Sequence, residues 1–442
     1  MKKNPLMKGA ALLTGISLLT RIMGFFYRIF LSRTFGEESV GLYQLIFPVF
    51  ALALAFSVSG IQTALSRIVA YKIGRHDVSG ARESLCLSLI LSLFLSLLSM
   101  VMIQQKAVFI AEKLMSEPRC TDLLIIMTYA IPFAAIHSCI SGYYYGLKQT
   151  AVPAVSQLLE QIFRISCVYF LYRVSVAEHL KADIAFAVAG IVIGEVASSA
   201  CTIISLKTSQ NIRIFGQHHS QSLSSVFCNL KELTLLSAPL SGNRIILTVL
   251  QSVEAVSIPI QLQTAHYSVS EALSIYGVLT GMSLPCIMFP SVITNSVSVL
   301  LTPTVAGIQS AAKEKQLSRI IRNTCILGFA LGLFSCLFFL IFGNLIGRIL
   351  FHSEMAGKFI LILAWICPFL YLSTALASIL NGLGKTAITF LINLVGITIR
   401  ILSIFLLIPF FDLKGYLWGL LLSQIVICGA LLQYLKIYIR KN

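Results

Sequence analysis

Apolar stretches separated by short polar segments recur along the whole chain. A helix rises ~1.5 Å per residue, so about 20 apolar residues are enough to cross the hydrocarbon core of a bilayer. Twelve such stretches are expected, at 9–33, 40–71, 82–104, 123–146, 152–173, 183–206, 232–256, 273–306, 319–348, 358–382, 386–410 and 415–438. Several are longer than the bilayer requires, which indicates tilting, bending or extension beyond the membrane. The pattern predicts an all-α polytopic membrane protein with about 12 transmembrane helices.

The second half of the chain repeats polar positions of the first. The corresponding pairs include Lys8 with Lys231, Arg21 with Arg244, and Arg164 with Arg400. Six spans return each half to its starting side, so two six-helix lobes related by a pseudo-twofold axis along the membrane normal are expected. The expected organisation is an N-terminal lobe at 1–206, a cytoplasmic linker at 207–231 and a C-terminal lobe at 232–442.

The composition agrees with a membrane protein and changes the interpretation of the net charge. Charged residues make up 11% of the 442 residues, against about 25% in soluble chains. The net charge of +16 could suggest a nucleic-acid partner. With both termini inside, however, nineteen of the 33 Lys and Arg residues fall on cytoplasmic segments, which is the positive-inside asymmetry. We therefore expect a multi-pass protein of the plasma (inner) membrane with cytoplasmic termini, and no nucleic-acid partner.

Arginines inside the expected spans point to an anionic cargo. Arg21 and Arg244 each follow a lysine by thirteen residues, which puts them near the middle of the bilayer. An ionised group there costs at least ~2.5–3.5 kcal/mol unless it faces a polar interior. The spans hold Arg21, Arg28, Arg164, Arg244 and Arg400 against Glu160 and Glu195. The surplus of positive charge favours a phosphate-bearing substrate, because the guanidinium fork can donate two hydrogen bonds to phosphate.

Polar residues around these arginines are the candidate site. The candidate substrate-binding residues are Arg21, Arg28, Arg244, Gln62, Asn295 and Arg400. Polar stripes can also serve only as contacts between helices, worth ~0.6 kcal/mol per hydrogen bond. The candidates for a structural or coupling role are Glu160, Arg164, Glu195 and Glu254. Glu160 and Arg164 have the spacing of an intrahelical ion pair, whereas Glu254, near the outer end of its span, is a candidate for binding a coupling cation.

Three prolines, Pro285, Pro290 and Pro303, fall on the span expected at 273–306. Proline removes a backbone hydrogen bond and kinks a helix, so we expect this span to bend as a gate, although kinks can also merely accommodate packing. The histidines show no metal-ligand spacing, and no nucleotide-binding loop is found. We expect no catalytic residues, no metal site and no cofactor beyond a coupling monovalent cation or the membrane potential.

The N-terminal region resembles a known family. The residues that carry the resemblance are Thr20-Arg21, Gly24, Tyr27-Arg28, Gly36, Gly41-Leu42-Tyr43-Gln44, Pro48, Gly60-Ile61 and Gly80-Ala81, with Asn381-Gly382-Leu383-Gly384-Lys385 in the second half. In these positions the chain resembles the stage V sporulation protein B-like oligosaccharide flippases of the multidrug/oligosaccharidyl-lipid/polysaccharide exporter (MOP) superfamily. Many members of that branch have fourteen spans, whereas twelve are expected here.

The resemblance implies a transporter rather than an enzyme. The expected function is an alternating-access flippase that moves a polyprenyl-pyrophosphate-linked saccharide, such as lipid II or another cell-envelope precursor used in peptidoglycan synthesis or sporulation, from the inner to the outer leaflet. The expected partners are this anionic lipid-linked sugar, the lipid bilayer and cell-wall glycosyltransferases. Two alternatives stay open: a cation-coupled multidrug exporter of the same superfamily, and a non-transporting scaffold.

Overall fold

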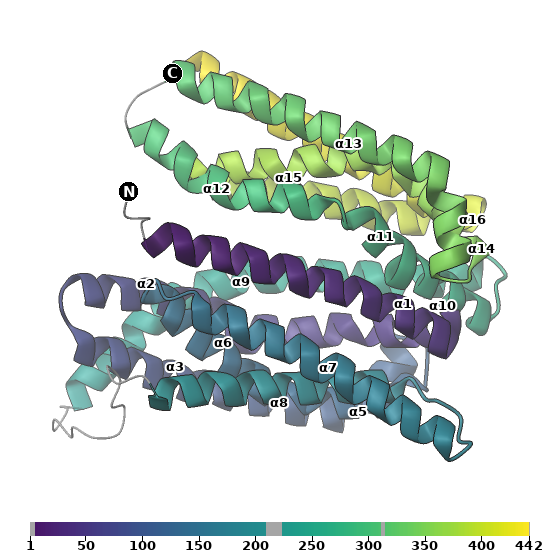
Figure 1. Cartoon of the computed structure of the whole chain (residues 1–442), viewed down its shortest axis with the longest axis horizontal. Helices are drawn as coiled ribbons and strands as arrows, with labels where there is room; N and C mark the ends of the chain where they lie inside the picture. Colours follow the sequence, from purple (N-terminus) through teal and green to yellow (C-terminus); the bar gives the residue numbers. More distant parts are fainter. Residues whose placement is uncertain (1–4, 209–222, 311–313, 442) are drawn as a thin grey trace. The chain divides into compact units, whose positions relative to one another are not determined.

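The computed structural model describes residues 5–208, 223–310 and 314–441, and over these ranges it contains helices and no strands (Figure 1). The first half comprises α1 (Pro5–Leu54), the π-helical turn η1 (Ala55–Ser59), α2 (Gly60–Gly74), α3 (Val78–Gln105), α4 (Ala107–Phe109), η2 (Ile110–Leu114), α5 (Cys120–Thr128), α6 (Ala130–Gly146), α7 (Ala151–Ala177) and α8 (Ala185–Thr208). The second comprises α9 (Leu223–Thr264), α10 (Val269–Gly277), η3 (Val278–Ser283), α11 (Leu284–Met288), α12 (Ser291–Ser310), α13 (Glu314–Leu350), α14 (Glu354–Leu363), η4 (Ala364–Ile366), α15 (Cys367–Gly382) and α16 (Thr386–Lys441).

Nine helical stretches among the described residues are long and apolar enough to cross a membrane. Two of them, Gly15–Gly74 with 60 residues and Thr386–Tyr438 with 53, are long enough to cross twice. Each is bent at one residue with a positive φ: Gly36 (φ 80°) in α1 and Asp412 (φ 54°) in α16. Gly36 has ψ 172°, a region that is essentially open only to glycine. The bends fall between the expected spans 9–33 and 40–71, and between 386–410 and 415–438.

The described chain forms two compact units that interleave in the sequence. One consists of Met1–Tyr27 and Leu45–Ser252, and the other of Arg28–Gln44 and Val253–Asn442. These units differ from the lobes expected at 1–206 and 232–442, because α1 and α9 each contribute to both. Close packing explains why most of α9 belongs to the first unit: a Cβ on Gly60 of α2 would lie 2.6 Å from the Ser241 nitrogen of α9. The expected linker at 207–231 lies largely outside the described residues.

Small residues bring the helices of the first unit together. Gly142 and Gly146 of α6 face the backbone of α2, where added Cβ atoms would lie 2.8 Å from the carbonyl oxygens of Gln62 and Ser66. Gly194 of α8 approaches α7 in the same way, with 2.9 Å from its Cβ position to the Glu160 carbonyl oxygen. The first two contacts hold α6 against α2, and the third holds α8 against α7 beside Glu160.

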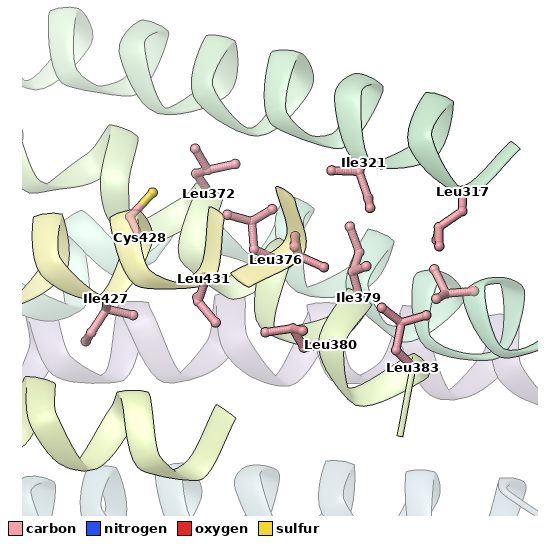
Figure 2. Packing of buried hydrophobic residues seen from close by; sticks show 12 residues of the cluster. Leu317, Ile321, Leu372, Leu376, Ile379, Leu380, Leu383, Ile427, Cys428 and Leu431 are labelled. Carbon is pink, nitrogen blue, oxygen red and sulfur yellow. The ribbon is translucent and has the colours of Figure 1, made fainter. Parts of the chain in front are cut away.

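The second unit is built around α13, α15 and α16. Figure 2 shows the apolar cluster between them, formed by Leu317 and Ile321 of α13, Leu372, Leu376, Ile379, Leu380 and Leu383 on or just after α15, and Ile427, Cys428 and Leu431 of α16. The α1 segment that belongs to this unit packs on α10, where Gly41 and Gly277 face each other. Arg33 of the same segment donates from Nε to the Leu350 carbonyl oxygen at the end of α13, at 2.8 Å.

The span expected at 273–306 is not one continuous helix. It is divided into α10, η3, α11 and α12, and the helix is interrupted at Phe289 and Pro290. Pro285 lies in the first turn of α11, directly after the π-helical turn η3. Pro303 lies within α12. The interruption gives a structural basis for bending, and the gating role of the three prolines stays a prediction.

Candidate functional site

The first unit carries three of the candidate substrate-binding residues. Arg21 on α1 and Arg244 on α9 are exposed, and the guanidinium group of neither forms a hydrogen bond or ion pair with any described residue. Each lies well inside a membrane-spanning stretch, Gly15–Gly74 and Asn229–Thr264. Gln62 on α2 is half-buried beside Gly142. Both guanidinium groups thus lie on helices long and apolar enough to cross a membrane, and neither has a counterion among the described residues.

The second unit carries the other three. Arg28, in the part of α1 that belongs to this unit, is half-buried and donates from Nη1 to the carbonyl oxygen of Thr280 in η3 at 3.3 Å. Asn295 on α12 and Arg400 on α16 are also half-buried. The six candidates therefore divide equally between the two units.

Arg400 has a partner in the second unit that the sequence did not identify. Its Nε lies 3.1 Å from Oε1 of Glu254 on α9, and the Tyr416 hydroxyl donates to the same oxygen at 2.7 Å. Glu254 is only 8% exposed. The carboxylate expected near the outer end of a span as a cation ligand is therefore buried against an arginine that compensates its charge.

A polar cluster in the first unit joins α6, α7 and α8. His137, Glu160 and Glu195 each direct one side-chain atom to within 4.8 Å of the others. Glu160 also pairs with Arg164, one helical turn further along α7, as the spacing predicted. His137 lies with Nδ1 3.5 Å from Oε2 of Glu195, and its Nε2 is 3.2 Å from the hydroxyl of Ser156. We call His137, Glu160, Arg164 and Glu195 the α6–α8 cluster.

One oxygen of the α6–α8 cluster is unsatisfied. Glu195 is 8% exposed, and its Oε2 makes no hydrogen bond with the described residues. The two carboxylates of Glu160 and Glu195 face the single guanidinium of Arg164, which gives a net charge of −1 before His137 is counted. A buried charge of this kind is costly unless it is paired. The cluster is therefore equipped to take up one proton or one small cation, whose preferred ligands are oxygen atoms.

His137 is the residue that sequence reasoning missed. It lies 23 residues before Glu160 and 58 before Glu195, so no helical spacing connects the three. The packing of α6 and α7 on α8 alone brings them together.

Two family models match the chain. The model described as "Polysaccharide biosynthesis protein" matches residues 6–309, and the MatE model matches residues 245–406. Stage V sporulation protein B of Bacillus subtilis (strain 168) is 28% identical over 407 residues, which are 92% of this chain and 78% of that protein. The lipid II flippase MurJ of the same organism is 25% identical over 168 residues, 36% of this chain and 31% of that protein.

Solved structures share the fold. An inward-facing multidrug resistance MATE family transporter of the MOP superfamily aligns with a TM-score of 0.77 at 16% identity, covering 98% of both chains. A MOP superfamily transporter from Pyrococcus furiosus, whose binding pocket is described as having reversed polarity, aligns with a TM-score of 0.70 at 15% identity, covering 99% of this chain and 96% of that one. The expected fold class is confirmed: the chain is an all-α polytopic membrane protein with the two-lobe fold of this superfamily.

Proposed function

Since the chain belongs to the polysaccharide biosynthesis protein family and is a membrane transporter of the MOP superfamily rather than an enzyme, we propose that it is a lipid-linked saccharide flippase. Its cargo is a polyprenyl-pyrophosphate-linked saccharide such as lipid II. The sugar and pyrophosphate cross from the inner to the outer leaflet by alternating access, while the polyprenyl chain stays in lipid.

The observation that carries this proposal is the exposure of Arg21 and Arg244 and the lack of a counterion for either in the described part of the chain. Both are exposed at membrane depth and have no counterion among the described residues. An arginine is tolerated at that depth when it faces a polar or water-filled interior. Such an interior with an excess of guanidinium groups attracts an anion, and a pyrophosphate offers several oxygens to a bidentate donor. In the second unit, Arg28 is a further guanidinium for an anion, and the amides of Gln62 in the first unit and Asn295 in the second suit sugar hydroxyls.

The other buried charges have different roles in this proposal. Glu254 compensates Arg400 within the second unit, so Arg400 adds little to the positive surplus. The α6–α8 cluster keeps an unsatisfied carboxylate oxygen and supports coupling to a proton or monovalent cation, with the membrane potential as a further driving force.

The relatives support the cargo class. One is named for sporulation and another as a lipid II flippase. By the positive-inside asymmetry, we place the protein in the plasma membrane with both termini in the cytoplasm. Cell-wall glycosyltransferases are the partners that would supply or use such a cargo.

The test is transport of a fluorescent undecaprenyl-pyrophosphoryl saccharide in proteoliposomes, read by accessibility of the sugar to an external quencher. We expect the R21A/R244A variant to flip at least ~10-fold more slowly, the effect of losing about 1.4 kcal/mol of phosphate interaction. The matched control is Arg173→Ala, because Arg173 is exposed near the end of α7. Full transport by R21A/R244A would contradict the phosphate site.

The same assay tests whether flipping is coupled to an ion gradient. An imposed proton or sodium gradient should accelerate flipping by the unmodified protein and have no effect on Glu195→Gln. A gradient response that survives in Glu195→Gln would exclude the α6–α8 cluster as the coupling site.

A multidrug exporter is the second candidate function, because the MatE model covers residues 245–406. It predicts that cells expressing the protein resist cationic drugs. Drug resistance without transport of the lipid-linked sugar would replace the flippase proposal.

A further inference from the structure

An apolar groove of about 550 Å³ opens on the surface of the second unit. Its lining comes from α13, from α14 and the turns that follow it, from α15, and from the second half of α16. The lining residues are Leu340, Leu361, Ile362, Trp365, Phe369, Leu417, Trp418, Leu421 and Ile425. All are hydrophobic, so the groove offers no polar partner to a sugar or a phosphate and suits a hydrocarbon chain.

Two of the helices that line this groove each carry a lysine just before their lining residues. Lys358 precedes Leu361 and Ile362 by three and four residues on α14, and Lys414 precedes Leu417 and Trp418 by the same spacings on α16. Residues three and four apart share a helix face and are about 5–6 Å apart. Each lysine therefore lies one helical turn beyond the apolar lining, on the same face of its helix.

Neither lysine is neutralised by the protein. Both are exposed, and neither forms an ion pair or hydrogen bond with the described residues. Of the nearest acids in the sequence, Glu354 pairs with Arg348 at 2.9 Å, and Asp412 lies at the bend of α16 and forms no ion pair with Lys414. Each of these two helices thus carries an exposed lysine, without a counterion among the described residues, one turn before its apolar lining residues.

The groove also holds the chain's two tryptophans. Trp365 is 57% exposed and Trp418 is 64% exposed. Their indole N–H groups have no acceptor among the described residues. Tryptophan combines an apolar ring with one polar donor, and this favours the boundary between lipid chains and headgroups.

We infer that this groove is a binding site for one anionic phospholipid. One acyl chain lies in the groove against the two indole rings, and the phosphate of the headgroup lies between Lys358 and Lys414. A lysine near a membrane surface adds about fivefold in affinity for an anionic lipid, so two lysines supply roughly thirtyfold. The site does not depend on the cargo, since none of its residues belongs to the candidate substrate site.

The tryptophans make the site directly measurable, because all tryptophan fluorescence of the chain arises in the groove. The full-length protein is reconstituted in phosphatidylcholine vesicles that contain increasing fractions of phosphatidylglycerol with brominated acyl chains. Brominated phosphatidylcholine is the comparison lipid. We expect half-maximal quenching by the phosphatidylglycerol at a mole fraction roughly thirtyfold lower than that of the phosphatidylcholine.

Variants distinguish binding of the lipid headgroup from binding of the acyl chain. K358A/K414A should lose the preference for phosphatidylglycerol and keep the quenching by both lipids at high fractions, which also shows that the groove is intact. K106A/K181A, which removes two exposed lysines elsewhere, should behave like the unmodified protein. Equal quenching by the two lipids in the unmodified protein, or an unchanged preference in K358A/K414A, would overturn the inference. Relief of quenching by unlabelled undecaprenyl phosphate at lower fractions than unlabelled phosphatidylglycerol would also overturn it, and would assign the groove to a polyprenyl chain.

Discussion

Arg164 and Arg400 lie at equivalent positions of the two halves, but their charges are balanced by carboxylates in different places. Arg164 pairs with Glu160 on its own helix, whereas Arg400 pairs with Glu254 on α9. Gly396 stands where the counterpart of Glu160 would be, and its Cβ position lies 2.3 Å from a side-chain atom of Ile427. A carboxylate there would clash with the second half of α16, so the charge that balances Arg400 comes from another helix.

Removal of one partner from the Glu254–Arg400 pair should destabilise the protein. Arg400→Leu leaves a buried carboxylate without its counterion, which costs about 3–5 kcal/mol. Tyr416→Phe removes only one hydrogen bond, at about 1 kcal/mol. The measurement is the free energy of unfolding in mixed detergent micelles.

The double variant is the control for this pair. In E254Q/R400L no buried charge is left unpaired, so its loss of stability should be smaller than the sum of the losses in Glu254→Gln and in Arg400→Leu. If the loss of stability in the double variant equalled the sum of the two single losses, the two side chains would not interact.

At the scale of elements, close backbone contacts decide which helices pair. The α1 segment Arg28–Gln44 packs on α10 through Gly41 and Gly277. A Cβ on Gly277 would lie 2.3 Å from the Glu37 carbonyl oxygen and 2.6 Å from the Gly41 nitrogen. These are backbone atoms, so the helices themselves would have to separate to admit a side chain.

Gly277→Ala should therefore lower stability by about 1–3 kcal/mol, the usual cost of overpacking a close contact. The matched control is Gly429→Ala on α16, where nothing lies within 4 Å of the Cβ position. That substitution should raise stability by roughly 0.5–1 kcal/mol, because alanine is the better helix former. Thermal melting followed by helical circular dichroism measures both, and equal effects would contradict the close contact.

At the scale of the whole molecule, the distribution of basic residues predicts the direction of insertion. An epitope tag placed after Arg75, between α2 and α3, should be reachable only from the cytoplasmic side. A tag placed after Lys181, between α7 and α8, should be reachable from outside. Antibody binding to intact cells and to permeabilised cells distinguishes the two sites. Antibody binding to the tag after Arg75 on intact cells would show that the orientation is the opposite of the one expected.

Much of the molecule follows from local patterns. The apolar stretches predict the helices, and the spacing of Glu160 and Arg164 predicts their ion pair, because both depend on residues within a few helical turns. The prolines on the span at 273–306 signal an interruption, and the structure has one at Pro290. The bends at Gly36 and Asp412 fall where the expected spans end, since the chain must reverse there to stay in the bilayer.

The sequence by itself thus determined the all-α membrane fold, the repeat of polar positions in the two halves and the excess of arginine within apolar stretches, since each depends only on composition and on spacing along the chain. Only the tertiary structure decided which charges are left without partners. It paired Glu254 with Arg400, joined His137 to Glu160 and Glu195, and brought Trp365 and Trp418 into one groove. Such contacts depend on how closely helices distant in the sequence approach one another, and small residues such as Gly194 and Gly396 set that distance.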